Sequence, residues 1–100
     1  MSEKIFSLND IRDIVRPFAD KYKIDEVYLF GSYARGEADE GSDLDLLVYG
    51  GKGFRRVNVL AFGEDLREAF KKDVDAYEIC EINRGTDFYD AIMRDKVKVI

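Results

Sequence analysis

The spacing of apolar residues changes several times along the chain, and each spacing predicts a different element. Between Ser7 and Lys23 the apolar residues recur every three or four positions, which predicts an amphipathic helix. Ser7 and Asp10 have the spacing of a capping box at the start of this helix. Pro17 lies inside the segment and has no backbone N–H, so we expect either a kink there or a helix that begins later.

Three short segments have the composition of β-strands. Residues 27–30, 44–48 and 74–79 are rich in β-branched, aromatic or other large apolar side chains. The first segment is followed by Gly31 and the second by the pair Gly50-Gly51, and glycine commonly ends a strand. We therefore expect three strands at these positions.

Two more helices and a last strand are predicted in the rest of the chain. Apolar residues keep helical spacing from Phe54 to Lys72, with Gly63 as the weak point of that helix. Thr86 can cap a short helix that continues through Met93. Residues 97–100 can add a terminal strand. The predicted order is α-β-β-α-β-α, followed by this optional β.

The length of the chain agrees with a single small domain. A chain of 100 residues buries little more than ~60% of its unfolded surface, which leaves no room for a second catalytic domain. Apolar residues make up 46% of the sequence, enough for a packed core. We assign residues 1–100 to one domain of the α/β, more narrowly α+β, class.

Composition narrows the chemistry that this domain can perform. The 16 Lys and Arg residues and 21 Asp and Glu residues give a net charge of −5, so no overall positive field attracts nucleic acid or an anionic membrane. An anionic substrate would need local help, most simply a bound cation. The absence of histidine excludes the Ser-His-Asp and Cys-His triads, histidine-bearing zinc sites and an imidazole base.

The cysteine count and the lack of long apolar runs bear on location. Cys80 is the single cysteine, so it has no partner for an intrachain disulfide, and we expect it in the core of a protein from a reducing compartment. The sequence has no apolar run of 18 residues and no signal-peptide pattern at its start. We expect a soluble, cytoplasmic protein.

Two carboxylates are placed together on the second predicted strand. Residues two apart in a strand point to the same face, so Asp43 and Asp45 project together while Leu44 and Leu46 take the other face. Carboxylates at this spacing, with no basic residue between them, suit a hard cation such as Mg²⁺. The pattern resembles half of a two-metal site. A Ca²⁺ loop is disfavoured, because the glycine and distal glutamate of an EF-hand are not in place.

A two-metal site needs a third carboxylate on a neighbouring strand. Asp75 is the best candidate, because it alternates with Val74 and Ala76 in the third predicted strand. Asp73 has the same parity but lies at the start of that strand, so we rank it second. Asp75 would reach the same cations if the third strand pairs beside the second.

The segment after the first strand has the features of a phosphate site. Gly31 at a strand end allows close approach of a ligand, and the Ser32 hydroxyl with backbone N–H groups of a following helical turn can hold phosphate oxygens. Arg35 can contact a phosphate, or pair with Glu37 or Asp39 instead. We include Ser42, beside the acids, among the candidate nucleotide-binding residues.

These residues together resemble a known signature. The chain has Gly31-Ser32, then ten residues, then Asp43-Leu44-Asp45. This pattern resembles the nucleotidyltransferase motif of the DNA polymerase beta superfamily. Over nearly its whole length the chain resembles the minimal nucleotidyltransferases encoded beside HEPN-domain proteins in toxin–antitoxin pairs. The resemblance implies a mixed sheet with helices mainly on one face, with Asp43, Asp45 and Asp75 as metal-binding acids.

The resemblance also implies an activity and a partner. It implies transfer of AMP from ATP, with two Mg²⁺ ions and release of pyrophosphate, to a hydroxyl of a HEPN toxin, in particular a tyrosine. The chain would then be the antitoxin of a type VII-like pair, in a hetero-oligomer or as a homodimer, with no direct contact to nucleic acid. Two alternatives remain: a catalytically silent antitoxin that acts by binding, and a nucleotidyltransferase for a small molecule or an RNA end.

Two groups of residues have less specific patterns. The basic residues Lys52, Arg55 and Arg56 can meet the triphosphate or an acidic partner, or form a solvated helix start. The tyrosines at positions 33, 77 and 89 can stack on a base, although packing within the protein is the commoner role for such residues.

Overall fold

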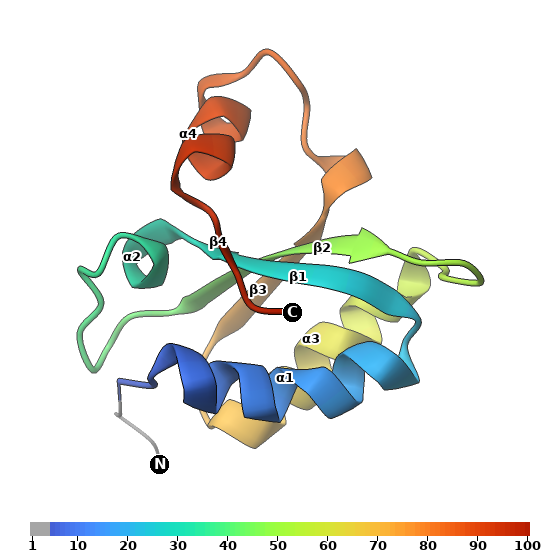
Figure 1. Ribbon diagram of the computed structural model, residues 1–100, viewed down its shortest axis with the longest axis horizontal. Helices are drawn as coiled ribbons and strands as arrows, with labels where there is room; N and C mark the ends of the chain where they lie inside the picture. Colours follow the sequence, from blue (N-terminus) through green and yellow to red (C-terminus); the bar gives the residue numbers. More distant parts are fainter. Residues whose placement is uncertain (1–4) are drawn as a thin grey trace.

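The four strands form one mixed sheet in the order β3-β2-β1-β4 (Figure 1). They are β1 (Ile24–Phe30), β2 (Leu44–Gly50), β3 (Val74–Glu78) and β4 (Val97–Lys98) in this computed structural model, which describes residues 5–100. β1 is antiparallel to both β2 and β4, whereas β2 and β3 are parallel. A parallel pair needs a crossover connection, which helix α3 (Val57–Phe70) provides here. The mixed sheet that the sequence suggested is confirmed.

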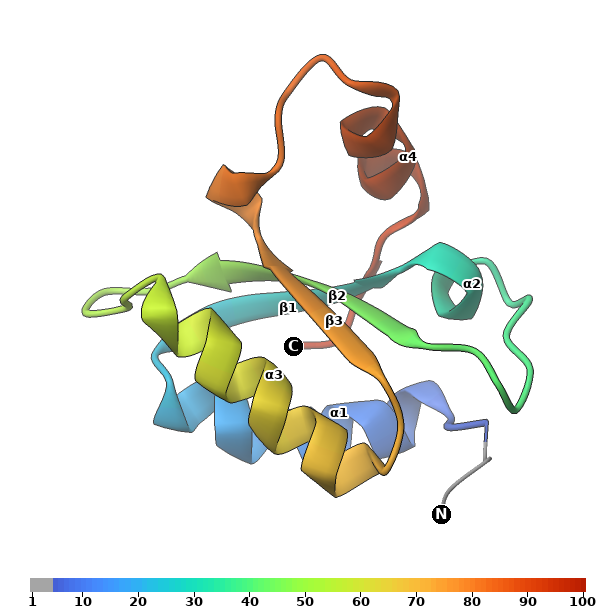
Figure 2. The same cartoon turned by 180° about the vertical axis from the view of Figure 1, so that it is seen from behind.

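The two long helices lie side by side on one face of the sheet. α1 (Leu8–Lys21) and α3 are on the same side in both views (Figures 1 and 2). They bury their apolar faces against alternate residues of the strands, because a half-buried strand presents every second side chain to the core. This main core contains Ile11, Val15 and Ala19 of α1, Phe62, Leu66 and Phe70 of α3, and Val27, Leu29, Leu44, Leu46 and Val48 of the sheet.

The other face of the sheet is covered only in part. The short helices η1 (Ile79–Glu81) and α4 (Asp87–Asp95) stand on this side (Figure 1). A second apolar cluster under them contains Phe30, Leu47, Ile82 and Ile92, which are all buried. The helices are therefore mainly on one face, as the sequence implied, and the face that carries Asp45 also has a small core of its own.

The first helix begins where its cap predicts. The Ser7 Oγ accepts a hydrogen bond from the backbone N–H of Asp10 at 3.1 Å, and the helix continues through Pro17 without interruption. Of the two alternatives expected at Pro17, a kink or a later start, the later start is therefore wrong. The helix ends at Lys21, two residues before the predicted end, because Lys23 has a left-handed backbone (φ 62°) that leads into β1.

The helix after β2 begins later than the apolar spacing predicted. The backbone N–H of Phe54 donates to the carbonyl of Gly51 at 3.0 Å, and Gly53 has a φ of 85°. This turn occupies the residues before α3, so the helix begins at Val57 instead of Phe54. A one-turn helix, α2 (Gly31–Ala34), also follows β1 and was absent from the predicted order of elements, although a helical turn was expected there.

The last part of the chain has the predicted helix and terminal strand, but β3 ends at Glu78 because Ile79 begins the unpredicted helix η1, and β4 covers only Val97–Lys98 of the predicted 97–100. The Thr86 side chain accepts from the N–H of Tyr89 at 3.1 Å and caps α4, and β4 pairs with β1 through Val97 and Leu29. Cys80 is an exposed free thiol, so its expected place in the core is wrong, because β3 has already ended at Glu78. No helix within residues 5–100 has the length and apolar character needed to cross a membrane.

Two leucines of α3 provide a test of this packing. Leu66 is fully buried in the main core, whereas Leu60 is 71% exposed on the same helix. Leu66→Ala should lower the free energy of unfolding by ~2–5 kcal/mol, because it removes buried methyl groups and leaves a cavity. Leu60→Ala should change it by less than ~0.5 kcal/mol. Urea unfolding followed by circular dichroism measures both values, and equal losses would contradict the assigned face.

Candidate functional site

Pairing of the strands places two of the three predicted acids opposite each other, and the third lies just before one of these strands. Asp45 and Asp75 are directly opposite each other in the parallel β2–β3 pair, so their side chains share one face of the sheet. Asp43 precedes β2 and is exposed, and its charge acts on Asp45. Asp73, the second-ranked candidate, is exposed before β3, and its carbonyl accepts from the N–H of Leu44 at 3.1 Å.

The pKa of Asp45 reports how closely these charges interact. Burial, followed by the negative charges of Asp75 and Asp43, raises this pKa from the ordinary value of 3.8 to about 6. The positive charge of Arg35 opposes the shift. Like charges held this close favour a bound cation, which would remove their repulsion.

The donor atoms of this group suit Mg²⁺ in particular. Within residues 5–100, no three Asp, Glu or Cys side chains converge closely enough to enclose a metal ion by themselves. Mg²⁺ is commonly held by one or two carboxylates, with waters and substrate phosphates completing its shell. Asp45 and Asp75, which are opposite each other in the sheet and only half-buried, match that open arrangement. The residues present therefore fit a magnesium ion whose remaining ligands come from a substrate.

Position 31 requires a glycine, both because of its backbone conformation and because of the neighbouring Asp45. Its φ of 71° is in the left-handed region that glycine adopts most easily. A Cβ at this position would also overlap the Oδ2 atom of Asp45, because Phe30 pairs with Asp45 at the end of β1. The backbone of Gly31 thus lies directly against the carboxylate of β2.

The other predicted phosphate-site residues lie near Gly31 but differ in their contacts. The carbonyl of Ser32 accepts from the N–H of Glu37 at 2.9 Å, which folds the loop after α2. The Arg35 Nε donates to Glu37 Oε1 at 2.9 Å, one of the two pairings that the sequence suggested, and its Nη1 is 3.8 Å from Asp95 Oδ2. The Ser42 Oγ accepts from the N–H of Asp39 at 2.9 Å and closes a local turn.

Lys72 fixes the loop that leads to the acids, and the sequence analysis missed it. Its Nζ donates to the carbonyls of Ser42 at 2.9 Å and Glu40 at 3.3 Å, and lies 3.3 Å from the hydroxyl of Tyr33. The lysine thus connects the start of β3 to the segment immediately before Asp43. A lysine at the end of a predicted helix gives no sequence signal for such a role, because its partners are backbone atoms about 30 residues away.

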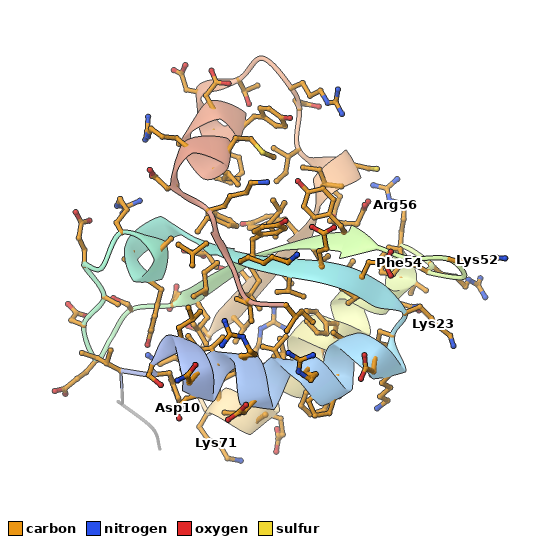
Figure 3. All side chains as sticks on the ribbon, viewed as in Figure 1. Asp10, Lys23, Lys52, Phe54, Arg56 and Lys71 are labelled. Carbon is orange, nitrogen blue, oxygen red and sulfur yellow. The ribbon has the colours of Figure 1, made fainter. Side chains whose placement is uncertain are left out.

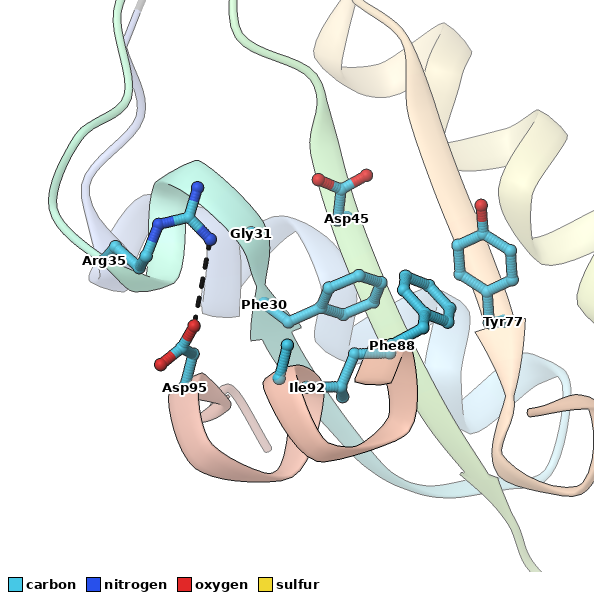
Figure 4. A pocket seen from close by; sticks show the side chains of 9 residues that line it. Phe30, Gly31, Arg35, Asp45, Tyr77, Phe88, Ile92 and Asp95 are labelled. Atoms are coloured by element: carbon cyan, nitrogen blue, oxygen red, sulfur yellow. Dashed lines mark ion pairs between the residues drawn. The ribbon is translucent and has the colours of Figure 1, made fainter. Parts of the chain in front are cut away.

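A pocket of about 270 Å³ opens beside Asp45 (Figure 4). Gly31, Arg35 and Asp45 line one part of it, and Phe30, Tyr77, Phe88, Ala91, Ile92 and Asp95 line the rest. Three aromatic rings meet there, with centroid distances of 5.9 Å for Phe30 and Tyr77 and 6.0 Å from Phe88 to each of them. Sequence reasoning missed Phe30, Phe88 and Asp95, because nothing in the sequence shows that α4 returns to the end of β1.

The remaining candidates lie away from the acids or pack within the protein. β2 extends from Leu44 to Gly50, so the basic residues 52, 55 and 56 follow the end of this strand that is opposite to Asp45. Figure 3 labels Lys52 and Arg56 in this part of the chain, and Arg56 borders a pocket with Ala76 of β3. Contact of these basic residues with the triphosphate or with an acidic partner stays a prediction. Tyr33 packs against the main core and Tyr89 against the second cluster, which is the commoner role considered for both.

Removal of the Asp45 charge should stabilise the protein when no divalent cation is present. A carboxyl whose pKa is raised on folding opposes stability once it ionises, so its cost increases as the pH rises from about 4 through about 6. Asp45→Asn should gain ~1 kcal/mol over the wild type at pH 7.5, a value reduced for the partial exposure of this group, and little at pH 4. Thermal unfolding in EDTA at both pH values measures the difference.

An exposed carboxylate on α1 provides the control for that comparison. Asp13→Asn should give no comparable gain at either pH, because Asp13 lies on the helix face that points to solvent. A gain by Asp45→Asn that is equally large at pH 4 would contradict the assignment of the effect to ionisation.

Gly31→Ala and Gly36→Ala separate backbone strain from contact with Asp45. Both glycines have a φ near 70°, but a Cβ at Gly36 would meet no atom within 4 Å. Each variant should lose roughly 1–2 kcal/mol of stability to the left-handed backbone. Only Gly31→Ala should also displace the Asp45 carboxylate and change its ¹³C resonance and titration by NMR. An unchanged Asp45 signal in Gly31→Ala would contradict the close approach.

Comparison with known proteins agrees with this geometry. The family model for the nucleotidyltransferase domain matches residues 11–99. The chain is 35% identical over 69 residues to "Putative protein adenylyltransferase MJ0435" of Methanocaldococcus jannaschii, and the match covers 69% of this chain and 74% of that protein.

Two solved structures are similar to the fold. One carries the description "Structure of putative minimal nucleotidyltransferase", with 26% identity, a TM-score of 0.74, and coverage of 92% of this chain and 95% of that one. A chain from the complex of a tri-AMPylated HEPN toxin with an MNT antitoxin of Shewanella oneidensis has a TM-score of 0.63 at 20% identity, covering 93% and 68% of the two chains, which shows likeness of fold. With the family model matched over most of its length and the acids paired across β2 and β3, this chain belongs to the nucleotidyltransferase domain family.

Proposed function

We propose that this chain is a Mg²⁺-dependent protein adenylyltransferase that transfers AMP from ATP to a tyrosine hydroxyl of a HEPN-domain toxin. The observation that carries the proposal is the register of β2 and β3, which sets Asp45 opposite Asp75, with the backbone of Gly31 against the Asp45 carboxylate. The similarity to a protein named as an adenylyltransferase supports the choice of AMP and of a protein acceptor. The toxin–antitoxin complex among the similar folds supports an antitoxin role in a type VII-like pair.

The residues of the site have separate tasks in this reaction. When bound, Mg²⁺ would neutralise charge on the triphosphate and lower the pKa of the acceptor hydroxyl. Asp43, just before β2, Asp45 on β2 and Asp75 on β3 would hold the cation. The Gly31 backbone and the Ser32 hydroxyl bind phosphate oxygens, as the phosphate-site pattern suggested. Arg35, whose guanidinium lines the same pocket, adds positive charge beside them.

The bond changes balance within this set of groups. The tyrosine oxygen forms a bond to the α-phosphorus of ATP, and the bond from that phosphorus to the bridging oxygen of pyrophosphate breaks. Asp75 accepts the proton of the tyrosine hydroxyl, which is a role for a carboxylate within hydrogen-bond reach of the acceptor. Pyrophosphate leaves with the electron pair of the broken bond.

The decisive experiment is labelling of the acceptor. The protein, Mg²⁺, ATP labelled at the α-phosphorus and a HEPN-domain protein encoded beside it should give labelled HEPN protein, with the label on tyrosine by mass spectrometry. The double variant Asp43→Asn/Asp45→Asn should reduce the rate by ~100-fold or more, because the charge that binds the cation is lost. Glu40→Gln, an exposed acid of the same loop, should leave the rate unchanged.

The same variants distinguish the alternative functions. Equal labelling by the double variant would overturn the assignment of the acids. If neither protein labels the toxin and both still neutralise it, the chain acts as an antitoxin by binding alone. If label appears on an RNA end or a small hydroxylated molecule and never on the HEPN protein, the acceptor class is wrong.

A further inference from the structure

We propose that the pocket between α2, α4 and the sheet is the binding site for the base of the nucleotide, with the ring of Phe88 as its stacking surface. The proposal rests on the function proposed above and adds to it the residues that recognise the planar, aromatic part of the substrate. It assigns a binding role to α4, a helix that carries none of the three predicted metal-binding acids.

The pocket is continuous with the acid site. Gly31 and Asp45 belong to its lining and also to the group that would hold the phosphates and the cation. A ligand that fills both must therefore be anionic at one end and flat and apolar at the other. A nucleotide has this distribution of charge. The volume of about 270 Å³ is slightly below the range for whole drug-sized ligands, about 300–1,000 Å³, and suits one part of a ligand.

Half of the Phe88 side chain is exposed, although the ring also packs against two other aromatic rings. Phe88 lies in the first turn of α4, and the rings of Phe30 and Tyr77 pack edge-on against it. An aromatic ring with a half-open surface beside a carboxylate site can stack on any base, because every base has a π face. Figure 4 shows the Phe30 and Phe88 rings between the Asp45 carboxylate and Ile92.

The polar wall of the pocket is held in place by an ion pair. Arg35 at the end of α2 lies 3.8 Å from Asp95 at the end of α4, and both residues line the pocket (Figure 4). This wall presents donors and acceptors opposite the aromatic rings. A few polar groups facing an apolar surface are the usual arrangement of a small-molecule site.

The position of the pocket favours the nucleotide over the acceptor side chain. Its polar part lies on the β1 and α2 side of Asp45, where Gly31 and Arg35 are located. Asp75, which faces the acceptor in the proposed reaction, lies on β3 at the other side of Asp45 and does not line the pocket. An acceptor tyrosine is therefore expected on the side of β3, and the base of ATP in the pocket.

Binding of two probes separates recognition of the base from recognition of the phosphates. Dissociation constants of ATP and inorganic tripolyphosphate are measured by calorimetry in Mg²⁺ with the intact protein. Phe88→Leu keeps an apolar side chain but removes the stacking ring, so it should weaken ATP binding by about 5-fold or more and leave tripolyphosphate binding unchanged. Phe88→Tyr restores the ring and the affinity for ATP. Leu60→Ala, an exposed apolar residue on α3, should affect neither ligand.

Any other result of these binding measurements would contradict a specific part of the proposal. Equal weakening of both ligands by Phe88→Leu would show that the ring only supports the fold, and an unchanged ATP affinity would show that the base binds elsewhere. If Phe88→Leu raises the KM for the HEPN acceptor alone, the pocket takes the acceptor. Wild-type protein that binds tripolyphosphate as tightly as ATP has no base site, whereas wild-type protein that binds neither ligand contradicts the proposed function itself.

Discussion

The parallel pairing of β2 with β3 is the constraint on which the site depends. This register sets Asp45 beside Asp75 on one face of the sheet and Leu44 beside Val74 on the other. The apolar neighbours are fully buried under α1 and α3, and a one-residue slip would turn every side chain of one strand to the wrong face. The apolar core therefore keeps two like charges on neighbouring strands of the same face, although they repel each other.

The grouping of Asp43, Asp45 and Asp75 is electrostatically unfavourable. Burial and two neighbouring carboxylates raise the pKa of Asp45 to about 6, so the ionised form is disfavoured in the absence of a cation. The positive charge of Arg35 relieves part of the repulsion, and Lys72 holds the loop before Asp43 through backbone carbonyls. Such a site is stable only because the surrounding sheet and helices are packed independently of it, and a bound cation would change the repulsion into attraction.

Particular elements show why sequence patterns predicted some features and missed others. The caps at Ser7 and Thr86 were predicted correctly, because a capping side chain bonds to a backbone group only three residues away. The start of α3 was wrong by three residues, because the turn that ends on Phe54 is itself apolar and fits the helical spacing. Cys80 was expected in the core from its residue type, yet its exposure depends on where β3 stops.

The sequence by itself determined the three longer helices and the order of the strands. It also determined the face of β2 that carries Asp45 and the motif of Gly31, Ser32, Asp43 and Asp45, because each of these depends on residues close together in the chain. Only the tertiary structure decided that Asp75 lies opposite Asp45 and that Phe88 of α4 joins Phe30 of β1 in one pocket. These contacts join residues 30 or more positions apart. They follow from how the strands pair and where α4 returns to the sheet, which depends on packing of the whole chain and not on local preference.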